Sequence, residues 1–158
     1  MINAAIVGLG WWGRYIVGSL QGKSDSIRFI RAVDTDPDAA SSFADENGLR
    51  FSSDFGDALN DDTVDAVILA TPHSWHEEQI VQAAAAGKHV FSEKPLALKK
   101  ASAMRAVAAC EHAGVILGIG HERRFEPALI EIKTLVDSGV LGTIMHVEAN
   151  FSHDGLAA

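Results

Sequence analysis

The sequence predicts an α/β protein built on a doubly wound parallel sheet with helices on both of its faces. Three observations favour this fold class. Short apolar runs alternate with segments of helical periodicity along most of the chain. The first of these runs is unbroken, which is typical of a parallel strand covered on both faces. Glycine or proline ends several of the segments, as expected at the turns of such a fold.

Six strands are expected before residue 121. The first contains the apolar run Ala4–Val7, and the clearest internal strand is Val64–Ala70, which is apolar after Asp65. Right-handed crossovers between parallel strands give the sheet order 3-2-1-4-5-6. The remaining strands are expected at Arg28–Val33, Arg50–Ser52, Lys88–Ser92 and Val115–Ile119.

The helices are placed by their end signals and by apolar residues three and four positions apart. The first is expected to begin near Trp11, and a second over Pro37–Glu46 starts at a proline. The others are expected at Phe55–Leu59, His73–Ala86 and Ala101–Ala113. The side chains expected to face the sheet are Trp12, Ile16, Ser19, Leu20, Ile80, Ala83, Ala84, Ala103, Ala106, Val107 and Cys110.

The pattern changes after Gly120. A helix is expected over Pro127–Asp137, closed by Gly139, with one apolar face packed inward. Thr143–Ser152 then alternates between apolar and polar residues, which predicts a half-buried antiparallel strand. The helix residues expected inside are Ala128, Leu129, Ile132, Leu135 and Val136.

A single amphipathic strand cannot form a sheet alone, and an open apolar edge favours pairing with another chain. We therefore expect residues 1–120 to form one domain, and residues 121–158 to form a junction helix and the first strand of a truncated α+β domain. The chain would then be the first part of a longer protein, or would complete its second sheet as a homo-oligomer.

The turn after the first strand carries the motif Gly8-Leu9-Gly10-Trp11-Trp12-Gly13. In a dinucleotide-binding turn, the first glycine permits the tight turn, the second lets the backbone approach a pyrophosphate, and the third lets helix and strand pack closely. Asp34 follows Gly13 by 21 residues, where a carboxylate binds ribose hydroxyls and repels a 2′-phosphate. The motif therefore predicts NAD as cofactor in preference to NADP. The alternative is a glycine turn with an incidental surface aspartate.

Composition excludes several classes of protein. The net charge is −8, the isoelectric point is near 5.2 and no basic run occurs, which argues against a nucleic-acid partner. The start resembles no signal peptide, and no apolar run reaches the roughly 18 residues that cross a membrane, so a soluble cytoplasmic protein is expected. The single cysteine, Cys110, is expected in the core without chemistry. The histidines lack metal-ligand spacing, so no metal is expected.

Five segments together resemble the Gfo/Idh/MocA oxidoreductases, the family of glucose-fructose oxidoreductase and inositol 2-dehydrogenase. These segments are Gly8–Gly13, Ala32–Asp34, Ala70–Pro72 with His76, Gly87–Ala97 and Arg124–Ala128. The segment Gly87–Ala97, GKHVFSEKPLA, is far more specific than the glycine turn. The resemblance implies an NAD(P)-binding Rossmann fold and hydride transfer between nicotinamide and a sugar, cyclitol or related alcohol.

The resemblance also implies a catalytic role for Lys94, which would lie beside the nicotinamide and hydrogen-bond the reacting oxygen. An ammonium group there can polarise a carbonyl and take part in proton transfer. The alternative is a loop lysine paired with Glu93. The bond between Lys94 and Pro95 is expected to be cis by the same resemblance. The motif and the resemblance together give the cofactor-binding candidates Gly8, Gly10, Trp11, Trp12, Gly13, Asp34, Thr71, Pro72, His76, Glu93, Lys94 and Arg124.

Some of these candidates have plainer alternatives. His76 could equally cap or pack its helix, and a tryptophan in the position of Trp12 is more often part of the core. Arg123 and Arg124 adjoin each other, and one of them could brace the junction through Glu122 or Glu126.

The sequence departs from the family in length, because the residues that bind and deprotonate substrate in relatives come from a larger second sheet. This polypeptide alone is therefore expected to bind NAD(H) and to turn over little or nothing. A second hypothesis is a non-catalytic dinucleotide-binding sensor or regulatory module. A third, a methyl transferase with a similar glycine turn, is disfavoured by the segment Glu93-Lys94-Pro95.

Overall fold

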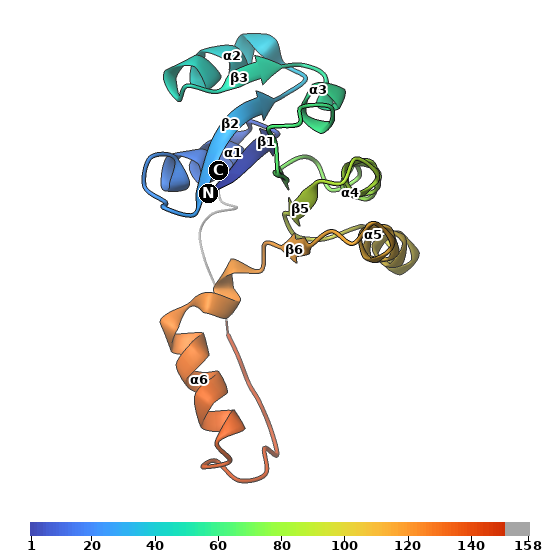
Figure 1. The fold of residues 1–158 in the computed structure, drawn as a ribbon. Coiled ribbons are helices and arrows are strands. Elements are labelled where there is room, and N and C mark those ends of the chain that lie inside the picture. The colour runs from blue at the N-terminus through green and yellow to red at the C-terminus, as the bar shows by residue number, and fades with distance from the viewer. Residues whose placement is uncertain (151–158) are drawn as a thin grey trace. The chain divides into compact units, whose positions relative to one another are not determined.

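The computed structural model describes residues 1–150. The chain divides into two compact units, the first ending at His121 and the second beginning at Glu122. The first unit contains a six-stranded sheet in the order β3-β2-β1-β4-β5-β6, with every neighbouring pair parallel (Figure 1). The predicted order and the α/β class are thus confirmed. The strands are β1 (Ile2–Val7), β2 (Ile27–Val33), β3 (Arg50–Ser52), β4 (Ala66–Leu69), β5 (His89–Ser92) and β6 (Leu117–Ile119).

The helices of the first unit occur where they were predicted, with shifted ends in places. α4 begins after a turn in which the Trp75 N–H donates to the Pro72 carbonyl, so it starts later than His73. β6 also starts later than predicted, because the Val115 N–H still donates to the Cys110 carbonyl at the end of the preceding helix. The helices are α1 (Trp11–Leu20), α2 (Pro37–Glu46), α3 (Phe55–Leu59), α4 (His76–Ala85) and α5 (Lys100–Ala113).

Each face of the sheet has its own hydrophobic core. Alternate side chains of a strand point to opposite faces. In β1, Ala5 and Val7 pack with residues of α3, α4 and α5, whereas Ala4 and Ile6 pack with residues of α1 and α2. These four side chains have at most 2% of their surface exposed. The unbroken apolar run of β1 therefore reflects helices on both faces, as predicted.

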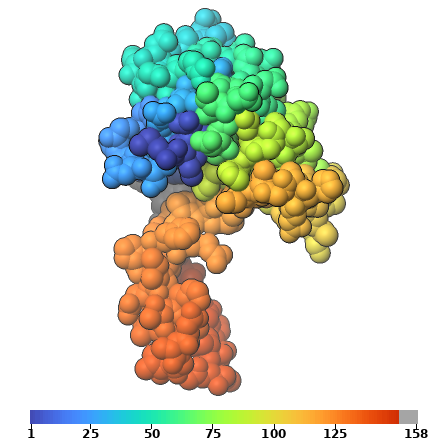
Figure 2. All heavy atoms as spheres, in the orientation of Figure 1, coloured from blue at the N-terminus to red at the C-terminus, as the bar shows by residue number. Residues whose placement is uncertain are grey.

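Two of the predicted helix faces are partly wrong. In α1 the buried residues are Gly13 and Val17, whereas Ser19 is exposed. This face is set by Gly13, which packs directly on the Gly8 carbonyl. In α5, Cys110 is buried as predicted, but Val107 is 38% exposed. α5 lies side by side with α4 (Figures 1 and 2) and precedes the edge strand β6, so only a narrow stripe of it is covered.

The second unit contains the 3₁₀ helix η1 (Glu122–Phe125) and the helix α6 (Pro127–Asp137), whose predicted bounds are confirmed. The prediction that its apolar face is buried is wrong, because no second α-helix or strand of the described part of this unit covers α6. Its atoms are drawn in orange in Figure 2. The residues predicted inside, all of them exposed, are Ala128, Leu129, Ile132, Leu135 and Val136.

The strand predicted at Thr143–Ser152 is also wrong for the described residues, since residues 143–150 have no strand assignment. Phe151 and Ser152 lie outside the described residues. A strand requires hydrogen bonds to a partner strand, and no strand of the described sheet pairs with this segment. Among residues 1–150, no helix is long and apolar enough to span a membrane.

Candidate dinucleotide-binding site

The three glycines of the turn between β1 and α1 have different surroundings. Gly8 has a φ of 91°, and a Cβ atom on it would lie 2.7 Å from the Ala70 carbonyl oxygen. A Cβ atom on Gly13 would collide with the Gly8 carbonyl oxygen. Around Gly10, in contrast, nothing lies within 4 Å of the position that a Cβ atom would take. The first and third glycines therefore permit close packing, and the second faces space that a ligand can enter.

The helix α1 begins directly beside this space. Its N-cap residue, Gly10, has no side chain that could bond the first N–H groups, and no acidic residue lies in the first turn. The first N–H groups of a helix lack intrahelical partners, and the helix dipole favours an anion at this end. The turn therefore has the properties of a phosphate-binding site.

Asp34 follows β2 and is held against the glycine turn. Its Oδ2 atom accepts the Leu9 N–H at 2.5 Å, and its Oδ1 atom accepts the Asp36 N–H at 3.0 Å. A carboxylate offers about four lone-pair sites, so each oxygen keeps capacity for a further donor. Asp34 can therefore accept ribose hydroxyls without giving up the bonds that orient it.

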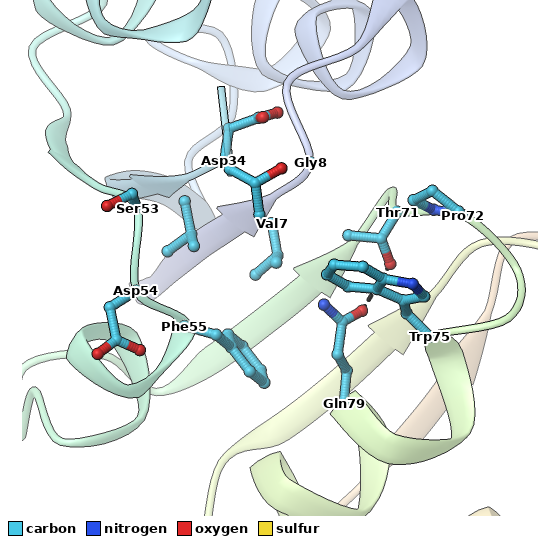
Figure 3. Close-up of a pocket in the computed structure, with 12 residues that line it drawn as sticks. Val7, Gly8, Asp34, Ser53, Asp54, Phe55, Thr71, Pro72, Trp75 and Gln79 are labelled. Carbon is cyan, nitrogen blue, oxygen red and sulfur yellow. Dashed lines mark hydrogen bonds between the residues drawn. The ribbon is translucent and has the colours of Figure 1, made fainter. Parts of the chain in front are cut away.

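A cavity of about 330 Å³ opens at the carboxyl ends of β1, β2, β3 and β4 (Figure 3). This edge is where open parallel sheets bind ligands. Figure 3 shows Asp34, Ser53 and Phe55 on one side of the cavity and Trp75 and Gln79 on the other. The lining consists of Val7, Gly8, Val33, Asp34, Thr35, Ser53, Asp54, Phe55, Thr71, Pro72, Trp75 and Gln79.

Sequence reasoning found the loop residues of this lining but missed two parts of its wall. One part is the segment Ser53–Phe55, which directly follows a predicted strand. The rule that ligands lie at the carboxyl ends of strands would have identified it. The other part is Trp75 and Gln79, which are four residues apart and so share one side at the start of α4.

Thr71 and Pro72 line the cavity from the loop between β4 and α4. The Thr71 hydroxyl donates to the Gln79 Oε1 atom at 2.6 Å, marked by the dashed line in Figure 3. His76 is not part of the lining, because its side chain is fully buried. Its two ring nitrogens lie against the carbonyl oxygens of Thr71 and Pro95, so it supports the loop.

Lys94 lies just after β5, and its peptide bond to Pro95 is cis, as expected. The lysine is exposed, and none of the ion pairs among the described residues involves it. The alternative pairing with Glu93 is therefore not formed. Glu93 is instead nearly buried, with its Oε2 atom accepting the backbone N–H of Lys94 at 3.2 Å. A Cβ atom on Gly120 would lie 2.6 Å from Glu93 Oε1, so this carboxylate packs on the end of β6.

Trp11 and Trp12 form an aromatic cluster with Tyr15 on α1. The ring of Trp12 lies 5.2 Å from that of Trp11 and 5.0 Å from that of Tyr15. Trp11 is exposed and Trp12 is partly buried, and Trp12 belongs to neither core cluster. The indole N–H of Trp12 is buried with no acceptor among the described residues. The alternative of a plain core role for Trp12 therefore does not fit.

Arg124 lies on η1 in the second unit. Its neighbour Arg123 pairs with Glu126 at 3.1 Å, which is the bracing role considered for one of the two arginines. A cofactor contact by Arg124 stays a prediction.

Among residues 1–150, no group of three or more histidine, cysteine or carboxylate side chains is arranged to hold a metal ion. Cys110 is a free, buried cysteine. Burial raises the pKa of its thiol, which makes a nucleophilic role unfavourable.

Residues 2–121 match the Gfo/Idh/MocA sequence family, described as an oxidoreductase family with an NAD-binding Rossmann fold. The chain is 34% identical to scyllo-inositol 2-dehydrogenase (NAD(+)) of Bacillus subtilis over 142 residues, covering 89% of this chain and 42% of that protein. It is 34% identical to an uncharacterized oxidoreductase of Streptococcus pneumoniae over 146 residues, covering 92% of this chain and 39% of that protein. The chain thus spans about two fifths of the length of the curated relatives it matches.

Solved structures of dehydrogenases are also similar to this chain, again over about two fifths of their length. The scyllo-inositol dehydrogenase of Lactobacillus casei, with bound NAD(H) and scyllo-inositol, matches with a TM-score of 0.82 and 32% identity, over 90% of this chain and 42% of that one. The WlbA dehydrogenase of Bordetella pertussis, in complex with NADH and UDP-GlcNAcA, matches with a TM-score of 0.84 and 33% identity, over 89% and 43%. An oxidoreductase from Desulfitobacterium hafniense described as NADPH-dependent matches with a TM-score of 0.83 and 27% identity, over 89% and 40%.

Proposed function

The chain belongs to the Gfo/Idh/MocA family of oxidoreductases, and on that premise we propose that it forms the coenzyme-binding part of a dehydrogenase. The proposed reaction is hydride transfer between a nicotinamide coenzyme and a sugar, cyclitol or related alcohol. One observation carries the proposal: a single turn contains both the open space at Gly10 and a glycine that lines the cavity. The space at Gly10 adjoins the start of α1, and Gly8 lines the cavity together with Asp34.

In this proposal the pyrophosphate contacts the unpaired N–H groups at the start of α1. The adenosine occupies the cavity, where Asp34 accepts the ribose hydroxyls. Phe55 and Trp75 both line this cavity, and aromatic rings offer a base extensive apolar contact in stacked or edge-on geometry. The nicotinamide end then extends toward β5, which neighbours β4 in the sheet.

We infer a preference for NAD over NADP from the charges around the ribose site. Asp34 would repel a 2′-phosphate. Arg14, the cation tied to the same turn, donates to the carbonyl oxygens of Leu9 and Ala39, and so its guanidinium is already engaged. Titration with both reduced coenzymes tests the inference. NADH should bind at least about tenfold more tightly than NADPH. Equal affinities for the two coenzymes would contradict the inference.

Lys94 is the proposed catalytic residue. A bound nicotinamide coenzyme supplies or accepts the hydride. The ammonium of Lys94 donates a hydrogen bond to the substrate oxygen, stabilises negative charge on it and takes part in the proton transfer. Its exposure and its lack of an ion-pair partner among the described residues fit this role.

We propose that residues 1–120 are the coenzyme domain, that residues 121–158 begin a substrate and dimerisation domain, and that the protein forms a homo-oligomer. Since the chain spans about two fifths of its relatives' length, this polypeptide alone should bind NAD(H) with little turnover. The proposed setting is the cytoplasm and the proposed partner a small polyol, with no nucleic acid or membrane involved.

The test of the proposal is NADH formation from NAD⁺ with inositols and sugars, measured on the longest form of the protein that its gene encodes. Lys94→Ala should lower turnover about a hundredfold or more while leaving NADH affinity nearly unchanged. Lys99→Ala, which removes a neighbouring exposed lysine, is the matched control and should keep full activity. Unchanged turnover in Lys94→Ala would remove the proposed role of Lys94, and a lack of turnover in the unsubstituted protein would leave the alternative of a non-catalytic dinucleotide-binding module. Binding of S-adenosylmethionine in place of NADH would refute both.

A further inference from the structure

His76 is a fully buried polar side chain at the first position of α4. Its Nδ1 atom lies 2.8 Å from the Pro95 carbonyl oxygen, and its Nε2 atom lies 3.0 Å from the Thr71 carbonyl oxygen. Both are hydrogen-bond distances. The ring therefore spans two loops that are far apart in the sequence, one after β4 and one after β5.

The chemistry of these two contacts restricts the state of the ring. A carbonyl oxygen can only accept a hydrogen bond, so each ring nitrogen must donate for both bonds to form. A neutral imidazole has one N–H, and its other nitrogen would turn a lone pair toward the second oxygen. The ring protonated on both nitrogens satisfies both carbonyls with charge-assisted hydrogen bonds.

Burial and the dipole of α4 oppose a positive charge at this position. The two carbonyl oxygens favour it, as does Glu78 in the first turn of α4, whereas Glu77 of the same turn already pairs with Arg105. The ring of His73 meets His76 edge-on, with the ring centroids 5.6 Å apart.

We propose that His76, protonated on both ring nitrogens, is a positioning residue that ties the cofactor loop at Thr71 to the loop that carries Lys94. The effect of this tie on coenzyme binding and on Lys94 rests on the proposed function. Thr71 lines the coenzyme cavity and bonds Gln79, and Pro95 directly follows Lys94 across the cis bond. One buried ring thus fixes both the wall of the coenzyme site and the direction of the proposed catalytic lysine.

Two substitutions separate the two bonds. In His76→Asn the side-chain amide nitrogen takes the place of Nδ1, so the bond to Pro95 is kept and the bond to Thr71 is lost. In His76→Gln the amide nitrogen reaches the place of Nε2, so the bond to Thr71 is kept and the bond to Pro95 is lost. His73→Gln is the matched control, because His73 is an exposed histidine of the same loop that lines no part of the coenzyme cavity.

Two readouts follow the two loops. NADH affinity, measured by energy transfer from tryptophan to the coenzyme, reports the Thr71 loop. The ¹³C-methyl resonance of reductively methylated Lys94, assigned by its loss in Lys94→Arg, reports the second loop without any coenzyme. The Asn variant should weaken NADH binding about tenfold and leave the Lys94 resonance in place. The Gln variant should keep NADH affinity within about twofold and shift or split the Lys94 resonance.

The protonation of the His76 ring is tested in the unsubstituted protein, so the test does not depend on whether a variant folds. A ¹⁵N–¹H spectrum at neutral pH should show protons on both ring nitrogens of His76. A single protonated nitrogen, or Asn and Gln variants that change the same readout equally, would overturn the proposal. Failure of NADH to bind the unsubstituted protein would refute the proposed function, while the spectrum and the Lys94 resonance would still decide the state and role of His76.

Discussion

Replacing Gly10 by alanine separates the fold from coenzyme binding. Gly10 has a φ of −64° and an extended ψ of −174°, which alanine adopts without strain, and its added methyl group would meet no protein atom within 4 Å. Alanine is a poorer N-cap than glycine, but it also lowers the entropy of the unfolded chain, so the stability change should stay within about 0.5 kcal/mol. The methyl group instead occupies the space proposed for the pyrophosphate.

The cost for binding follows from the contacts that the methyl group blocks. Moving the phosphates away from the start of α1 loses about two charge-assisted N–H bonds, each worth about 1.5 kcal/mol at the lower end of the usual range. The sum of about 3 kcal/mol corresponds to roughly a hundredfold loss of NADH affinity. Tryptophan-to-NADH energy transfer measures this affinity, and thermal unfolding measures the stability.

Gly18→Ala is the matched control, because Gly18 lies in the same helix, is exposed and also has nothing within 4 Å of its Cβ position. This substitution should stabilise the protein by about 0.5–1 kcal/mol and leave NADH affinity unchanged. If Gly10→Ala binds NADH as tightly as the unsubstituted protein, the space at Gly10 does not hold the phosphates and the reasoning fails.

Three further predictions concern other parts of the first unit. Gly13→Ala should lower stability by about 3 kcal/mol or prevent folding, because its methyl group meets backbone, and a thermal shift of less than about 2 °C would contradict this. Asp34→Asn removes the charge beside the ribose, so the ratio of NADPH to NADH affinity should rise about tenfold in paired titrations. Asp61 has a carboxyl pKa held below its ordinary value by hydrogen bonds from Thr63 and Arg31. Asp61→Asn should therefore cost about 2 kcal/mol at pH 7. Because the pKa of Asp61 is depressed in the folded protein, the stability difference between the variant and the unsubstituted protein is fully present above about pH 4 and should shrink as the pH falls below that value. Urea unfolding measures this difference, and a difference that does not change with pH would contradict the proposed contribution of the Asp61 carboxylate.

Much of the first unit could be predicted because its signals are local. The apolar run of β1 needed only its own residues to indicate a strand covered on both faces. The spacing from Gly13 to Asp34 predicted that the glycine turn and Asp34 lie together, and the Leu9 N–H does donate to Asp34. The cis bond before Pro95 was expected from the resemblance of its segment to a family, and it is present.

The parts that were missed depend on residues that meet only in three dimensions. His76 was considered a cofactor contact or a plain packing residue, but its two carbonyl partners lie 5 and 19 positions away along the chain. Trp75 and Phe55 share a cavity although Phe55 begins α3 and Trp75 directly precedes α4. The face of α6 was predicted to be buried because periodicity reports which residues would be covered, and it carries no information on whether a covering element is present.

A crystal structure of the protein with NADH bound tests the central claim most directly. The account predicts the two phosphates against the backbone N–H groups at the start of α1, the adenine ribose hydroxyls within hydrogen-bond distance of Asp34, and the nicotinamide directed toward Lys94. A coenzyme bound elsewhere, or bound with its ribose hydroxyls out of reach of Asp34, would contradict it.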